Sequence, residues 1–186
     1  SASMLGYNVL ITTSNAHDIS ELQSLVESNR VDGMLLTRAL EDDRALQYLS
    51  QANFPTALTG TCRYDNIIQV DTDNEGAAEK MTTLLIGKGF RRFAFLVKDM
   101  SYNVDRKRHE GFCRALIKNG ISEKDQLFYN GSIRMEFLDA IIENIISKKV
   151  ECIICGDDEI CTMVMSRLQA EGYRIPKDVA IASLYN

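Results

Sequence analysis

The sequence predicts an α/β protein in which parallel strands alternate with helices that cover both faces of a sheet. Short β-branched and apolar runs alternate along the chain with longer segments whose apolar residues recur every three or four positions. Several of the short runs are almost wholly apolar, which is typical of strands buried on both faces. Glycines at Gly89, Gly120 and Gly172 follow the expected ends of three helices. A left-handed residue there lets the chain turn directly into the next strand.

The expected strands follow the apolar runs in order. Between them, apolar stripes identify helices, such as the stripe formed by Ala77, Met81, Leu84 and Leu85 and the stripe at positions 138, 141, 142 and 145. No Pro/Gly/Ser-rich linker and no low-complexity stretch separates tethered domains. The polar passage at residues 98–103 is where we expect the chain to cross between two lobes. The strands are expected at residues 8–12, 31–36, 55–58, 67–70, 93–97, 152–155 and 179–182.

Composition limits the classes of function. The 186 residues are 45% hydrophobic, which is enough for a packed core, and a net charge of -5 gives no basic face for gripping nucleic-acid phosphates. Five cysteines at irregular spacings are unlike a secreted disulfide scaffold and indicate a reducing cytoplasm. The first residues show neither a signal peptide nor a membrane anchor, so no membrane partner is expected.

The sequence lacks the motifs that identify the common classes of enzyme. There is no GxGxxG or GxxxxGK[ST] phosphate loop, and the glycines around Lys88 are assigned to helix capping. Cys152 and Cys155 fall in an expected strand, where residues three apart point to opposite faces, so they are interpreted as buried apolar residues. His17 and His109 are far apart, and neither is assigned a Cys or Glu partner at ligand spacing. We therefore expect no catalytic residue, no metal and no cofactor.

Polar residues at strand-to-helix junctions are the most informative feature, because small ligands bind outside the carboxyl ends of parallel strands. Three such places follow apolar strands: residues 71–74, residues 157–159 and the terminal Tyr185 with Asn186. For Asp73 and Asp157 the alternative is helix N-capping, which requires no ligand.

Arg108 is the expected cationic ligand-binding residue. Arg106, Lys107 and Arg108 open one helix, where successive residues point about 100° apart and therefore cannot share a target. A solvated helix face accounts for Arg106 and Lys107. Arg108 lies one turn before the apolar Phe112 and could donate a forked pair of hydrogen bonds to ligand hydroxyls or a carboxylate.

These residues resemble the motifs of the lactose-repressor (LacI/GalR) family of bacterial transcription regulators. DNEGAAEKMTTLLIGKGFRRFAF, from Asp73, is similar to the family's DNxxGAxxAxxHLIxxGHRxIAF. RHEGFCRAL, from Arg108, resembles RxxGFxxAL, and VDGMLL, from Val31, resembles VDGIIL. The last 35 residues, from Cys152, are similar to the family's run from NDxxAxG through RIPxDVxVxGxDD. The matches occur in family order over nearly the whole chain.

The resemblance implies a periplasmic-binding-protein-like (type I) fold, a truncated pair of Rossmann-like three-layer α/β lobes. The lobes are expected at residues 1–98 and 99–186, with a small-molecule cleft between them. The resemblance further implies a sugar or related metabolite as effector and a homodimer. Operator DNA would be bound by a helix-turn-helix headpiece lying upstream of this chain, and the protein would not be an enzyme.

Carried over position by position, the resemblance assigns effector contacts. Arg108 matches the family arginine that reaches the effector, and Asp157 matches the Asn of the ND pair. Tyr185 matches the first Asp of the final DD, and Asp73 matches the Asp of DN at the cleft edge. Tyr102 and Ile133 lie in loops that supply ligand walls in similar proteins.

Two departures bear on the effector. Asp157 replaces Asn and so loses a donor and adds charge, while Tyr185 replaces a carboxylate that commonly binds a sugar diol. The second change argues against a simple hexose. Two rival functions stay open at this point: a periplasmic solute-binding protein of the same fold, and a Rossmann-type or hydrolytic enzyme, which is disfavoured by the missing motifs.

Overall fold

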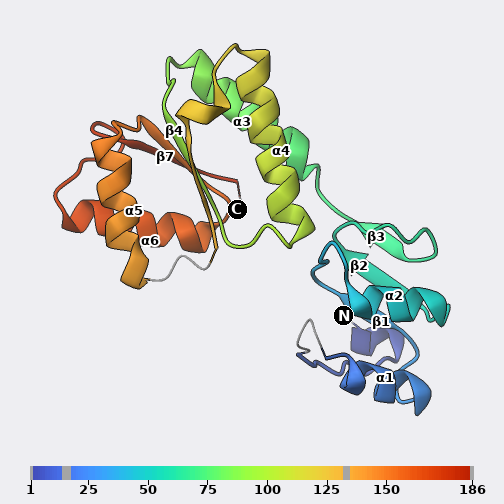
Figure 1. Ribbon diagram of the computed structural model, residues 1–186. Helices are drawn as coiled ribbons and strands as arrows, with labels where there is room; N and C mark the ends of the chain where they lie inside the picture. Colours follow the sequence, from blue (N-terminus) through green and yellow to red (C-terminus); the bar gives the residue numbers. More distant parts are fainter. Residues whose placement is uncertain (1, 14–17, 132–134, 185–186) are drawn as a thin grey trace. The chain divides into compact units, whose positions relative to one another are not determined.

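The computed structural model describes residues 2–13, 18–131 and 135–184 (Figure 1). The chain divides into two compact units, Ser1–Val70 and Asp71–Asn186, which we call unit 1 and unit 2. Each unit contains one parallel sheet, so the predicted α/β class with a pair of parallel-sheet units is confirmed.

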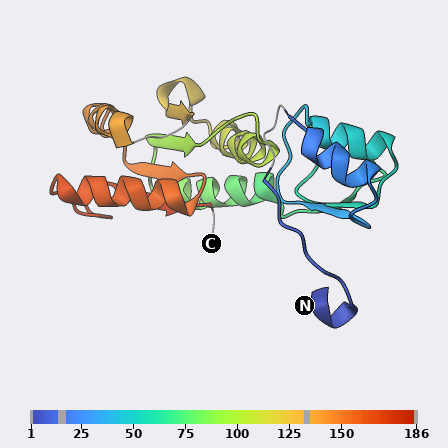
Figure 2. The ribbon, with the colours of Figure 1, turned by 90° about the horizontal axis from the view of Figure 1, so that it is seen from below.

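Unit 1 contains a three-stranded sheet in the order β1-β2-β3. The Asp43 side chain caps α2 by accepting hydrogen bonds from the backbone N–H groups of Ala45 and Leu46. Figure 2 shows α1 and α2 of this unit on one face of the sheet. The elements are a short 3₁₀ helix at Ala2–Leu5, α1 (Ser20–Glu27), β1 (Met34–Leu36), α2 (Arg44–Gln51), β2 (Thr56–Thr59) and β3 (Ile68–Val70).

The small core of unit 1 lies between its sheet and α2. Leu46 from α2 and Leu58 from β2 are fully buried in it, together with Ile67. Strand residues alternate between the two faces, so Leu35 and Ile68 point away from this core and are exposed. The sheet of unit 1 therefore buries one face only among the described residues.

Unit 2 contains a four-stranded parallel sheet in the order β5-β4-β6-β7. Figure 1 shows α3 and α4 on one side of this sheet and α5 and α6 on the other. The elements are α3 (Asn74–Gly87), β4 (Phe93–Val97), α4 (Asn103–Lys118), a 3₁₀ helix at Glu123–Asp125, β5 (Leu127–Asn130), α5 (Met135–Ser147), β6 (Cys152–Cys155), α6 (Asp158–Ala170) and β7 (Ala180–Ser183).

Side chains along β4 and β6 alternate between the two faces of the sheet, so each strand contributes to two separate apolar cores in unit 2. Phe95 packs toward α4 in one core, and Leu96 packs toward α5 and α6 in the other. Cys152 and Cys155 divide in the same way, and both are buried free thiols. This confirms their interpretation as buried apolar residues.

Most of the expected strands are confirmed, two of them with the predicted bounds, β4 and β6. Residues 8–12 are wrong as a strand, because they belong to no strand of the described sheets and Val9, Leu10 and Ile11 are exposed. The edge strand β5 was not expected. Gly89, at φ +102°, confirms the capping of α3.

The units divide earlier than the boundary expected at residue 98. Strand β4, which ends at Val97, pairs with β5 and β6, and α3 packs along α4. Both elements are therefore built into unit 2, and the polar passage after β4 is a loop within that unit rather than a crossing.

Candidate functional site

The carboxyl edge of the unit 2 sheet gathers polar side chains from three directions. The loop after β4 begins at Lys98, the turn after β6 contains Gly156 and Asp157, and α3 begins beside Asn74. Arg108, on the second turn of α4, contacts Asn74 and Gly156 at this edge and is only 8% exposed. This edge is where open parallel sheets bind ligands.

Arg108 joins two segments that are far apart in the sequence. Its Nε donates to Oδ1 of Asn74 at 3.1 Å, and its Nη1 donates to the carbonyl oxygen of Gly156 at 2.5 Å. Asn74 is itself buried and donates through Nδ2 to Asp71 Oδ1 at 2.9 Å and to the Thr72 carbonyl at 3.1 Å. The guanidinium is thus oriented by groups fixed in turn by their own partners.

A glycine permits this close approach of α4 to α3. A Cβ atom at Gly111 would collide with the carbonyl oxygen of Glu75 on α3. The two helices therefore pack closely, which keeps Arg108 within hydrogen-bond distance of Asn74. A side chain at position 111 would separate these helices.

Asp105 is a second buried ionisable residue, one helical turn before Arg108. Its Oδ2 accepts a hydrogen bond from the Asp99 N–H at 3.0 Å, and the residue is 7% exposed. Burial raises the pKa of the Asp105 carboxyl above its usual value, and the Asp99 hydrogen bond and the charge of Arg108 oppose this only in part. The site therefore contains a carboxyl group whose ionised form is disfavoured.

Asp157 caps α6 and binds a lysine. Its Oδ1 accepts from the Ile160 N–H at 2.8 Å, and its Oδ2 lies 3.0 Å from Lys98 Nζ. Lys98 also contacts Glu159 at 2.5 Å, and the hydrogen bond to Glu159 is the main cause that raises the pKa of the lysine. The capping interpretation of Asp157 is confirmed, and its ligand role stays a prediction.

The other predicted residues lie less centrally or outside the described structure. Asp73 is exposed and caps α3 by accepting from the Gly76 N–H at 2.8 Å. Tyr102 is half-buried immediately before α4. Ile133 and Tyr185 lie outside the described residues. The structure thus brings Arg108 to the direct sequence neighbours of Asp73 and Asp157, which are Asn74 and Gly156.

Sequence reasoning missed three polar residues at this edge. Asn74 is the second residue of the DN pair, whose first residue was selected instead. Asp105 lies three residues before Arg108, and helical residues at that spacing share a face. Lys98 directly follows a wholly apolar strand, which is the same signal that identified Asp157.

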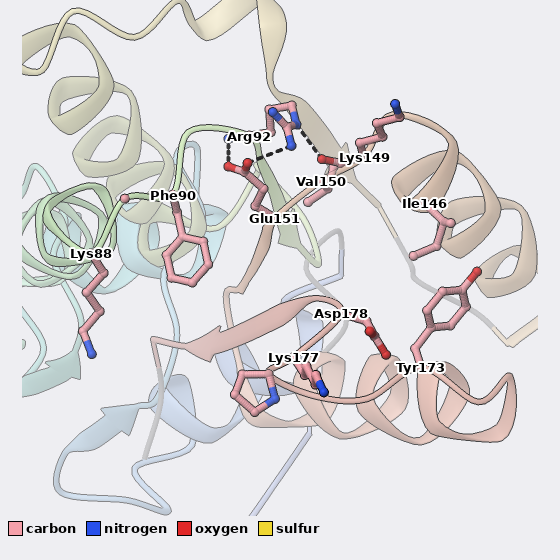
Figure 3. A pocket seen from close by; sticks show the side chains of 12 residues that line it. Lys88, Phe90, Arg92, Ile146, Lys149, Val150, Glu151, Tyr173, Lys177 and Asp178 are labelled. Atoms are coloured by element: carbon pink, nitrogen blue, oxygen red, sulfur yellow. Dashed lines mark hydrogen bonds and ion pairs between the residues drawn. The ribbon is translucent and has the colours of Figure 1, made fainter.

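The cavity in Figure 3 lies at the opposite, amino edge of the unit 2 sheet and is a poorer candidate. It encloses about 530 Å³ beside the residues that precede β4, β6 and β7. Arg92 and Glu151 form an ion pair at 2.7 Å on its wall. The carboxyl ends of α3 and α5 face it, and ligands of parallel sheets bind at the other edge.

Residues that could bind a metal ion are found on the outer part of α4. His109, Cys113 and Glu123 place one ligand atom each within 4.8 Å of the others. Among the described residues this is the one such group of three or more His, Cys, Asp or Glu side chains.

Comparisons of this chain with known proteins agree on one family. A family model described as "Periplasmic binding proteins and sugar binding domain of LacI family" matches residues 1–185. Catabolite control protein A of Staphylococcus xylosus is 26% identical over 189 residues, covering 100% of this chain and 57% of that protein. A crystal structure of a LacI transcriptional regulator from Bacillus cereus subsp. cytotoxis NVH 391-98 is 30% identical with a TM-score of 0.89, covering 98% of this chain and 67% of that one.

A structure of the transcriptional regulator CelR in complex with cellobiose is also similar. It is 26% identical with a TM-score of 0.81, and the match covers 96% of this chain and 57% of that one. The chain therefore spans little more than half the length of the curated relatives it matches. Within the residues described, no helix has the length and apolar character needed to cross a bilayer.

Proposed function

Since the chain belongs to the family of periplasmic binding proteins and LacI-type sugar-binding domains, we propose that it senses a sugar or related metabolite for a transcription regulator. The effector binds at the carboxyl edge of the unit 2 sheet, against Arg108. The observation that carries this proposal is the buried guanidinium, which is held in a fixed orientation by Asn74 and Gly156.

The chemistry of this edge suits a polyhydroxylated ligand. Arg108 has five N–H donors in a planar fork, and Asp157 and Asp105 offer carboxylate or carboxyl oxygens to hydroxyl groups. Lys98 balances the charge of Asp157. Asp73, Tyr102, Ile133 and Tyr185 complete the proposed contact set. A mixture of donors and acceptors on rigid elements is how proteins orient small polar ligands.

Regulation rests on differential affinity. An effector shifts a regulator between two conformations only as far as it binds one of them more tightly. We propose that this shift controls operator-DNA binding through a helix-turn-helix segment outside these 186 residues, in a cytoplasmic homodimer. The sensing role requires no catalysis. The curated relatives named above are transcription regulators, so a periplasmic transport role is the less favoured alternative.

Calorimetric titration of the chain with cellobiose and maltose tests the sugar class, and glucose, a simple hexose, is the comparison that should bind more weakly. We expect at least one of the two disaccharides to bind, and Arg108→Ala to weaken that binding by about 2 to 4 kcal/mol, as is typical when one charge-assisted partner is removed from a buried site. If neither disaccharide binds, the proposed sugar effector is wrong. Unchanged affinity in the variant would remove Arg108 from the site.

Two further variants separate binding from folding. Arg114→Ala removes the same side-chain type from the same helix, where Arg114 pairs with Glu75 and Glu79 on α3. We expect this exposed ion-pair change to leave sugar affinity unchanged. Arg108→Lys keeps the charge and loses the fork, so its affinity should be intermediate. Circular dichroism before each titration checks that the variants remain folded.

A further inference from the structure

Three metal-ligand side chains meet on the outer side of unit 2. His109 and Cys113 lie one turn apart on α4, and Glu123 begins the 3₁₀ helix that follows. Cys113 Sγ is 3.5 Å from His109 Nε2 and 3.2 Å from Glu123 Oε1. The earlier expectation of no metal overlooked this spacing of four residues, which places two side chains on one helix face.

The separations match those of a tetrahedral zinc site. With Zn–S of about 2.3 Å and Zn–N or Zn–O of about 2.1 Å, neighbouring ligand atoms in a tetrahedron stand about 3.5 Å apart. The two distances from Cys113 Sγ are close to this value. All three ligand atoms lie within 4.8 Å of one another, and Glu123 is an exposed side chain that can move the remaining distance.

Neighbouring aromatic rings fix the orientation of the His109 imidazole, and a carboxylate lies beside it. The His109 ring centroid is 4.2 Å from that of Phe128 and 5.9 Å from that of Phe95, which fixes the ring against the sheet. A neutral imidazole offers a lone pair to a metal ion. Glu123 places a carboxylate beside the ligand atoms of His109 and Cys113, and its negative charge attracts a cation.

We propose that His109, Cys113 and Glu123 bind one zinc ion, with the fourth position open to solvent. One nitrogen, one sulfur and one carboxylate oxygen suit zinc, whereas magnesium and calcium require oxygen ligands. Binding forms a Zn–S bond and releases the thiol proton to solvent. The ion ties α4 to the segment that leads into β5. It uses no residue of the proposed effector site.

Cobalt(II), a spectroscopic substitute for zinc, tests the site directly. The metal-free chain of 186 residues is titrated with Co²⁺ under reducing conditions. We expect one equivalent to give a sulfur-to-cobalt charge-transfer band with the visible bands of a tetrahedral ion, and Zn²⁺ to displace it. Cys113→Ser should abolish the charge-transfer band, and His109→Gln and Glu123→Gln should each weaken binding at least about tenfold.

Cys161→Ser is the matched control. Cys161 is also a half-buried helical cysteine of unit 2, but it belongs to no group of three ligands in the described structure. This variant should bind Co²⁺ as the parent does, and Zn²⁺ should protect Cys113 but not Cys161 from alkylation. The proposal is overturned if no charge-transfer band forms, or if the band survives Cys113→Ser. Loss of the band in Cys161→Ser would equally place the metal elsewhere.

Discussion

Units 1 and 2 are both built on a parallel sheet, but they cover it differently. All five residues of β4 in unit 2 are buried, because helices pack on both faces of that sheet. In unit 1, Leu35 is 69% exposed, Ile68 is 68% exposed and Val70 is 66% exposed. These three side chains lie on the face opposite α2, in the two outer strands β1 and β3, which flank β2.

The coverage of the two sheets indicates which unit contributes more to the stability of the chain. Burial of apolar surface contributes roughly 25 cal/mol per Å², and parallel sheets normally obtain it from both faces. Unit 2 has two apolar cores, while unit 1 has one small core around Leu46 and Leu58. Unit 2 should therefore hold most of the free energy of unfolding.

The largest expected effect comes from truncating one leucine in each unit. Leu96→Ala in β4 removes a fully buried side chain and leaves a cavity between the sheet and α5, so it should cost about 3 to 5 kcal/mol. Leu35→Ala, the same change on the open face of β1, should alter the free energy of unfolding by less than about 0.5 kcal/mol. Urea unfolding followed by circular dichroism measures both. Equal losses would mean that the open face is covered in solution.

Sequence reasoning succeeded where a strand is buried on both faces. The apolar runs at β4 and β6 were predicted with the bounds that the structure shows, because a strand without a solvent face has no polar positions. It failed at β5, an edge strand whose residues Leu127–Asn130 alternate between half-buried and exposed and include a terminal Asn. It also failed at residues 8–12, because an apolar run forms a strand only beside a partner.

The candidate site was predictable in part. Arg108 was identified as a ligand-binding residue because it lies one turn before the apolar Phe112, and the structure buries both side chains. Its partners were not predictable, because Asn74 is 34 residues away and Gly156 is 48 residues away. Only the close packing of α3 on α4, which Gly111 permits, brings these positions together.

Hydrogen exchange should show a smaller difference, in the free energy with which the backbone amides of the two units open. The slowest backbone amides of β2 should open with a free energy at least about 2 kcal/mol below that of the slowest amides of β6. This follows from the greater length of unit 2 and a typical stability of at least roughly 0.05 kcal/mol per residue. Mass spectrometry of peptides spanning the two strands measures the difference. Identical opening energies would show that the two units unfold as one.

The smallest effect that we predict is on the pH dependence of stability, through a buried carboxyl group. The two buried charged residues identified in the described structure, Asp105 and Arg108, both belong to unit 2. Because burial raises the pKa of Asp105, the folded state holds this proton more tightly than the unfolded chain does. The stability that Asp105 contributes is therefore complete below the ordinary carboxyl pKa and is lost as pH rises through the folded pKa.

Asp105→Asn should remove this loss, because an amide does not titrate. Its free energy of unfolding should fall less than that of the parent between acidic and neutral pH, by at most about 1.4 kcal/mol per pH unit for one proton. Asp178→Asn gives the opposite sign, because the Arg174 hydrogen bond lowers the pKa of Asp178 to about 2 and stabilises the fold above the ordinary pKa. Urea unfolding across this pH range measures both slopes. If Asp105→Asn and the parent show the same slope, the charge buried in unit 2 does not set its pH dependence.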